Sequence, residues 1–384
     1  MPQLDALYPD RLMEQARLTT SLDDFGGTQF EDALDVLCRS AREDGPRSDQ
    51  GVARLASNIG RQLSLRLNLA ADRKKHPEIS RQEIKAPLIL IGLPRSGTTI
   101  LHSLLAQDPA ARSPQRWEMT HPFPPPRAET YETDPRIALV DAEIETFDPD
   151  FRAMHRMAAT LPEECNSLVE ASFRTMNYWA QLALPSYVDW LLNDAAMSPA
   201  YAFHREFLQH LQAFAPRDYW VLKAPPHIFW PGYLLDTYPD ARIVMTHRDP
   251  RQVLPSNASL IAQVRAGAEE VDPRAVGADQ LLWNIGLQRT MALRKTWPRP
   301  EQFIDTYYSD FISDPLKVVK QIYDHFGMDL SEEAEGRMRR FMAGNEKEKH
   351  GKHVYSAEQF GLEPARIAEE FSEYMETFGL GDRP

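Results

Sequence analysis

Apolar residues along the chain follow two spacings, which together predict an α/β protein. Before residue 86 they recur every three or four positions among charged residues, as at Phe30, Leu34, Leu37 and Ala41, and this predicts helices. Further along, short continuous apolar runs are typical of strands buried in a parallel sheet. The predicted strands are Pro87–Ile91, Tyr219–Leu222, Arg242–Thr246 and Phe303–Tyr307. Helical spacing follows each of them, so we expect a mainly parallel sheet flanked by helices.

The same pattern divides the chain into regions. Residues 1–85 form an N-terminal helical region that packs on the core or forms one wall of an acceptor pocket. Residues 86–384 form the α/β domain, with a helical insertion at about 130–215 that is rich in Met, Phe, Tyr and Trp. Such an insertion is either ordinary core or a cap over a ligand pocket. The stretch 111–118, before the insertion, is expected to return the chain toward the sheet.

Composition narrows the class of partner. The chain has 384 residues and a formal net charge of −13, which argues against general binding to nucleic acids or to anionic membranes. Cys38 and Cys165 are too few for a disulfide framework, and neither has metal-ligand neighbours in the sequence. We therefore expect both in the core of a cytoplasmic protein. We also expect neither a signal peptide nor a membrane span.

The segment Gly92–Thr99, Gly-Leu-Pro-Arg-Ser-Gly-Thr-Thr, is the most informative motif. It has the glycine spacing and the hydroxyl pair of a phosphate-binding P-loop, and it stands between a predicted strand and a predicted helix. Thr98 occupies the position where a nucleotide triphosphatase has its lysine. The positive charge lies instead at Arg95, so the loop predicts phosphate binding without transfer of a γ-phosphoryl group.

Three basic residues follow the carboxyl ends of predicted strands or lie in the loop: Arg95, Lys223 and Arg248. Because parallel strands end at one edge of a sheet, where ligands bind, these side chains should converge. In an acidic protein such a group predicts a polyanion site.

Pro94–Thr99 after an apolar strand, with Arg248 and Ser256 after a later strand, resembles the sulfotransferase family. The resemblance covers roughly residues 85–360, and arginine in the loop is similar to the tyrosylprotein-type and many bacterial members. It implies a donor, 3′-phosphoadenosine 5′-phosphosulfate (PAPS), and a product, adenosine 3′,5′-bisphosphate. It assigns the 5′-phosphosulfate to the loop residues Arg95, Ser96, Gly97, Thr98 and Thr99. It assigns the 3′-phosphate to Arg248 and Ser256.

The resemblance also implies catalytic roles. Glu118 would take the proton from an acceptor hydroxyl, and the alternative is a surface ion pair with Arg112 or Arg116. Lys223 would stabilise developing charge, and the alternative is a solvated lysine at a strand end. His121 and His227 compete with Glu118 as the base, and they remain, with Glu164, candidates for acceptor contact. We expect no metal requirement, since arginine and lysine replace magnesium.

Other contacts implied by the resemblance are less defined. Tyr307, with Tyr308, would lie near the nucleotide or in the core, and Lys352 and His353 would close a basic lid over the phosphates or stay solvated. The predicted activity is sulfuryl transfer to a hydroxyl of a small-molecule, lipid or carbohydrate acceptor. An ATP-dependent phosphotransferase and a non-catalytic nucleotide-binding module are the alternatives.

Overall fold

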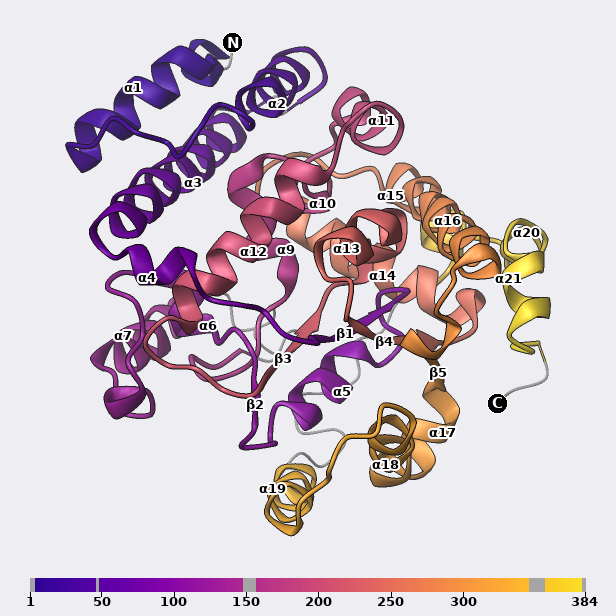
Figure 1. Cartoon of the computed structure of the whole chain (residues 1–384). Coiled ribbons are helices and arrows are strands. Elements are labelled where there is room, and N and C mark those ends of the chain that lie inside the picture. The colour runs from indigo at the N-terminus through magenta and orange to yellow at the C-terminus, as the bar shows by residue number, and fades with distance from the viewer. Residues whose placement is uncertain (1–3, 46–47, 148–156, 345–355, 382–384) are drawn as a thin grey trace.

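The chain folds around a parallel sheet in a computed structural model that describes residues 4–45, 48–147, 157–344 and 356–381 (Figure 1). Five strands lie in the order β2-β3-β1-β4-β5, and each neighbouring pair is parallel. The strands are β1 (Leu88–Gly92), β2 (Ala111–Arg112), β3 (Tyr219–Lys223), β4 (Arg242–His247) and β5 (Phe303–Tyr307). The predicted α/β class with a mainly parallel sheet is confirmed.

Four of these strands coincide with the predicted apolar runs. The exception is β2, which the sequence pattern did not reveal because its two residues are an alanine and an arginine. It lies at the edge of the sheet, where Ala111 is in register with Tyr219.

Helices cover both faces of the sheet. Strand residues alternate between the faces, so Leu88 and Leu90 pack in one buried cluster whereas Ile89 and Ile91 pack in another. The first cluster includes α5 (Thr98–Leu105), α17 (Tyr308–Ser313), α18 (Pro315–His325) and α19 (Glu332–Ala343). The larger cluster includes α12 (Ser198–Gln212), α13 (Pro231–Thr237), α14 (Pro250–Ala266) and α16 (Trp283–Thr296). The sheet is thus the middle layer of three.

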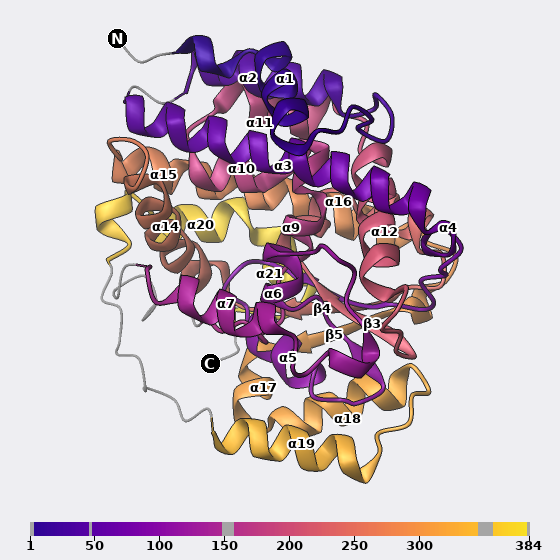
Figure 2. The same ribbon diagram turned by 90° about the vertical axis from the view of Figure 1, so that its left-hand side faces the viewer.

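The N-terminal helices pack on the larger cluster. They are α1 (Pro9–Thr20), α2 (Glu31–Glu43), α3 (Asp49–Lys75) and α4 (Pro77–Ser80), after a short 3-10 turn, Leu4–Leu7. Figure 2 shows α1, α2 and α3 side by side above the helices of the insertion. Leu34 and Leu63 of this region belong to the same buried cluster as Ile89 of the sheet.

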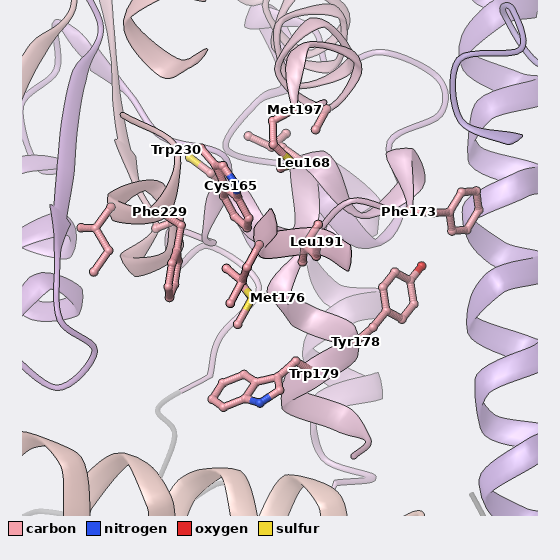
Figure 3. Packing of buried hydrophobic residues seen from close by; sticks show 14 of the residues in the cluster. Cys165, Leu168, Phe173, Met176, Tyr178, Trp179, Leu191, Met197, Phe229 and Trp230 are labelled. Carbon is pink, nitrogen blue, oxygen red and sulfur yellow. The ribbon is translucent and has the colours of Figure 1, made fainter. Parts of the chain in front are cut away.

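The insertion lies between β2 and β3. Its helices are α6 (Arg116–Thr120), α7 (Pro135–Ile144), α9 (Cys165–Val169), α10 (Met176–Gln181), α11 (Pro185–Asn193) and α12. Several of its aromatic side chains, including Phe173 and Tyr178, are fully buried (Figure 3), whereas Phe147 is 43% exposed. The buried ones are therefore core.

The helices after β4 and β5 complete the fold. The helical segment expected after the strand Phe303–Tyr307 is divided into α17 and α18. Pro315 begins the second helix, and Asp314 caps it by accepting from the backbone N–H of Lys317 at 3.0 Å. The helices that the sequence analysis did not predict are α15 (Pro273–Asp279), α16, α19, α20 (Pro364–Glu370) and α21 (Ser372–Thr377). Within the described ranges, no helix combines the length and the apolar composition that crossing a bilayer requires.

Candidate active site

The loop Gly92–Thr99 joins β1 to the N-terminus of α5 in a conformation that needs its glycines. Gly92 has φ 138°, and a Cβ there would lie 2.5 Å from the carbonyl oxygen of Thr246 on β4. Gly97 has φ 90° and is the N-cap residue of α5. The hydroxyl of buried Ser96 donates to the carbonyl of Leu93 at 2.6 Å and shares a hydrogen bond with the hydroxyl of Thr246. The loop is therefore fixed to the sheet, with the positive end of the helix dipole beside it.

Two of the three predicted basic residues meet on one side of this loop. Arg248, which follows β4, donates to the backbone carbonyl of Arg95 at 2.9 Å. Arg95 donates from Nε to the hydroxyl of Ser256 at 3.2 Å. The guanidinium of Arg248 lies over the ring of Tyr308, 3.9 Å from its centroid. Asp249, the next residue, pairs with Arg251 and caps α14.

The third basic residue lies at the other side of the loop. Lys223 ends β3 and is 1% exposed, so it is not a solvated strand-end lysine. Its ammonium donates to the hydroxyl of Thr99 at 3.2 Å and forms an ion pair with the carboxylate of Glu164. The Glu164 side chain is 31% exposed. A carboxylate, an ammonium and a loop hydroxyl thus lie in contact at the helix N-terminus, and the carboxylate is open to solvent.

Glu164 reaches this position because the insertion pairs with the segment after β2. The backbone N–H of Arg116 donates to Leu161, and that of Glu163 donates to Pro114 at 2.7 Å. Glu164 then occupies the N-cap position of α9. Asn166 donates to the second carboxylate oxygen at 3.1 Å, which orients the side chain.

Glu118 lies elsewhere, in the ion pair with Arg112 that the sequence analysis gave as its alternative, but in the core rather than on the surface. Its side chain is fully buried and forms an ion pair with Arg112. Its second oxygen accepts from the backbone N–H of Gln115 at 2.9 Å and from the hydroxyl of Tyr131 at 2.8 Å. The first of these bonds is half of a capping box at the start of α6. The carboxylate is therefore saturated by structural partners, and the proposed role as base conflicts with this geometry.

The two candidate histidines differ in exposure. His121 is partly exposed, and its Nε2 pairs with Glu143 at 2.9 Å. His227 is buried, its Nδ1 is 2.9 Å from the hydroxyl of Tyr201, and burial lowers the pKa of its ring to about 3. A base shielded from solvent in this way cannot meet an acceptor, so the candidacy of His227 as base or acceptor contact conflicts with the structure.

Tyr307 and Tyr308 are consecutive, but their rings have different neighbours. Tyr307 is half-buried, with its ring 5.4 Å from that of His247, whereas Tyr308 supports Arg248. Lys352 and His353, the predicted lid residues, lie outside the described residues.

An open cleft of about 700 Å³ lies between the N-terminal helices and the insertion. Residues of α1 and α3 form one wall and residues of α6 and α9 form the other, and the lining includes His121, Glu163, Phe123, Met119 and Leu65. Glu163 of the lining directly precedes Glu164 in the chain, whereas Glu164 and Lys223 are not themselves lining residues. The N-terminal region thus supplies one wall of the cleft, and the insertion contributes one buried aromatic residue, Phe207 of α12, to the other.

The expectation that Cys38 and Cys165 lie in the core is confirmed, but Cys165 has neighbours that the sequence did not indicate. Its thiol and one ring nitrogen each of His204 and His227 all lie within 4.8 Å of one another, and all three residues are buried. The residues are far apart in the sequence, so no spacing indicated the group. The sequence analysis also missed two residues that support the site. Thr246 shares a hydrogen bond with Ser96, and Gln252 accepts from Arg248 at 3.3 Å. Gln252 follows Arg248 by one helical turn.

Comparisons with known proteins agree with this geometry. Residues 87–332 match the model of a family described as the sulfotransferase family. A crystal structure of the sulfotransferase STF1 from Mycobacterium tuberculosis H37Rv superposes with a TM-score of 0.83 and 34% identity, covering 95% of this chain and 98% of that one. The structure of STF9 from Mycobacterium avium superposes with a TM-score of 0.89 and 29% identity, covering 96% of each chain.

A curated relative has a named acceptor. The omega-hydroxy-beta-dihydromenaquinone-9 sulfotransferase Stf3 of Mycobacterium bovis is 25% identical over 308 residues, which are 76% of this chain and 75% of the relative.

Proposed function

This chain belongs to the sulfotransferase family, and from that premise we propose that it transfers the sulfuryl group of PAPS to a hydroxyl of a largely apolar small molecule. The observation that carries the proposal is the meeting of Arg95, Arg248 and Ser256 beside a P-loop that has no lysine. A triphosphatase needs that lysine and a magnesium-binding acid, whereas a nucleotide with an additional 3′-phosphate needs a second basic clamp.

The donor would occupy both sides of the loop. The backbone N–H groups at the start of α5, with Thr98 and Thr99, face the position for a 5′-phosphosulfate. Arg248 and Ser256 would bind the 3′-phosphate, with Arg95 between the two groups. Arg248 is held for this task by Tyr308, whose ring supports the guanidinium, and by its hydrogen bonds to Gln252 and to the Arg95 carbonyl, which fix its orientation.

We assign the base to Glu164 rather than Glu118. Glu164 would accept the proton of the acceptor hydroxyl as the oxygen forms its bond to sulfur and the bond from sulfur to the phosphate oxygen breaks. Lys223, in contact with both Glu164 and Thr99, would then donate to the oxygen atoms on which charge develops. The support is positional, because Glu164 is the partly exposed carboxylate that contacts Lys223 beside the loop.

The cleft of about 700 Å³ suits the acceptor. Its volume lies in the range of pockets that hold drug-sized ligands. Its lining combines apolar side chains, such as Leu65, Met119 and Phe123, with polar ones, such as Arg116 and His121, which suits a lipid-like or aromatic alcohol with a polar end. The quinone-derived acceptor in the name of Stf3 belongs to this chemical class. Cys38 and Cys165 are both free, which suits a reaction in the reducing cytoplasm.

Thermal denaturation with two competing ligands tests the donor. Adenosine 3′,5′-bisphosphate at 100 times its Kd should raise Tm by about 3 °C, while ATP with magnesium should raise it less. Arg248→Ala should remove most of the shift. Arg251→Ala is the matched control, because Arg251 pairs with Asp249 on the same helix. A larger shift with ATP and magnesium would refute the donor assignment.

A further inference from the structure

A buried group of sulfur and imidazole ligands lies directly behind the Lys223–Glu164 pair. Cys165 begins α9, His204 is on α12, and His227 is in the 3-10 turn Pro225–Phe229 that follows β3. The three potential ligand atoms lie within 4.8 Å of one another. Each side chain is at least 95% buried: the exposed fractions are 1%, 0% and 5%. Figure 3 shows Cys165 among apolar side chains of the core, next to Trp230.

The hydrogen bonds of the two histidines leave one nitrogen of each ring available. The Nδ1 of His204 lies 2.6 Å from the hydroxyl of Tyr238, and the Nδ1 of His227 lies 2.9 Å from that of Tyr201. The Nε2 atoms of both rings are buried and have no hydrogen-bond partner among the residues that the structure describes. Buried polar atoms are almost always paired, so two orphaned nitrogens beside one thiol require an explanation.

We propose that Cys165, His204 and His227 bind one thiophilic transition-metal ion, Zn²⁺ or Cu⁺. With Nδ1–H donating to a tyrosine oxygen, each Nε2 presents its lone pair to the ion. Such an outer hydrogen bond from the second ring nitrogen is typical of metal-bound histidine. Thiolate and imidazole together are the ligands that both of these ions prefer.

The geometry needs only a small closing movement. A tetrahedral Zn²⁺ places bound nitrogen and sulfur atoms about 3.3–3.6 Å apart, as follows from its bond lengths of about 2.0–2.3 Å. Binding would replace the thiol proton, which leaves to solvent. Without metal, burial raises the pKa of the Cys165 thiol to about 12, so the thiol stays protonated.

The two ions differ in what they require of the site. Cu⁺ with one thiolate and two neutral imidazoles is uncharged and satisfied by three ligands, which suits an apolar interior. Zn²⁺ leaves a net positive charge and requires a fourth ligand, such as a water molecule. Either ion would join two helices of the insertion to the end of β3.

Metal titration of the full chain tests the site. The apo protein would be incubated with Zn²⁺ or, under reducing and oxygen-free conditions, with Cu⁺, then desalted and measured for metal and thermal stability. We expect one equivalent of one of these ions and a rise in Tm. Co²⁺ should give a thiolate-to-metal charge-transfer band, which reports sulfur ligation in the unaltered protein.

Variants separate ligation from general effects on folding. Cys165→Ser and His204→Gln should weaken metal binding at least tenfold, and Tyr238→Phe, which removes only the outer hydrogen bond, about tenfold. Cys38→Ser and His210→Gln are matched controls, since both residues are buried and lie outside the group. Retention of one equivalent by these controls supports the site. Failure of the unaltered protein to bind either ion, or undiminished binding by Cys165→Ser, overturns the proposal.

Discussion

Replacing Glu164 or Glu118 with glutamine should affect two different properties: turnover in the first variant and stability in the second. Glu164→Gln should remove turnover with the smaller loss of stability, because the carboxylate is partly exposed and its amide replacement can still accept from Lys223. Glu118→Gln should reduce stability with little effect on the chemistry, because Glu118 is fully buried among structural partners.

The expected magnitudes follow from burial. Loss of a general base lowers kcat by about 10²–10⁴-fold. Loss of one partner of a buried ion pair costs about 3–5 kcal/mol. With an unfolding entropy of about 2.1 cal/mol/K per residue over 384 residues, that cost lowers Tm by about 4–6 °C. Glu164→Gln leaves the buried ammonium of Lys223 with an amide oxygen in place of a carboxylate, so we expect a cost of about 1–3 kcal/mol and a fall in Tm of about 1–4 °C.

The assay measures sulfation of a panel of phenols and long-chain alcohols by mass spectrometry, together with thermal denaturation of each variant. Glu335→Gln is the matched control, since Glu335 of α19 is likewise partly exposed and pairs with basic residues, Lys320 and Arg339, but does not line the cleft. Binding of adenosine 3′,5′-bisphosphate should be unchanged in all three variants. Turnover lost in Glu118→Gln at an unchanged Tm, and retained in Glu164→Gln, would refute our assignment of the base.

Two further substitutions test the loop and its helix. Gly97→Ala should weaken binding of adenosine 3′,5′-bisphosphate by about tenfold, because φ 90° costs an L-residue about 1–2 kcal/mol and the new Cβ would lie 2.8 Å from the Tyr308 ring that supports Arg248. Gly336→Ala on α19, where the new Cβ would make only an ordinary contact with the Arg340 side chain at 3.5 Å, should leave binding unchanged in isothermal titration. Equal affinity of both variants would count against the clamp. Burial, with the nearby charge of Lys223, lowers the pKa of His102 from 6.5 to about 3. The unfolded chain therefore binds an additional proton below pH 6.5, and stability should fall by about 2 kcal/mol between pH 7 and 5 on account of His102 alone. His102→Gln should reduce this loss in denaturant titrations by that amount, and an unchanged pH dependence would contradict the buried neutral ring.

The strands and the loop could be predicted because their signals are local. A continuous apolar run, two glycines and a hydroxyl pair lie within thirteen consecutive residues, 87–99, and the structure reproduces that unit. The convergence of Arg95 with Arg248 follows from the rule that parallel strands end at one edge. β2 has no apolar run and was missed, since its two residues are recognisable as a strand only through pairing with β3.

The base could not be predicted in the same way. Glu118 follows the loop closely in the sequence, but its spacing from Gln115 is that of a capping box, which is a structural signal that was available. Glu164 is brought to Lys223 by tertiary pairing of 159–163 with 114–117, and neither segment carries a pattern that reveals this pairing. Cys165, His204 and His227 likewise meet only through the fold.

One peptide connects the two proposals. Glu164 and Cys165 are consecutive at the start of α9, and their side chains have different surroundings: the carboxylate contacts Lys223 and solvent, and the thiol contacts the buried histidines. His227 follows Lys223 by four residues, with a proline-started turn between them. A metal bound to Cys165 and His227 would therefore fix the backbone positions from which both members of the Lys223–Glu164 pair extend. Because misplacement of a catalytic group by about 1 Å can cost about 10²-fold in rate, an ion that touches no reacting atom would still act on turnover through this pair.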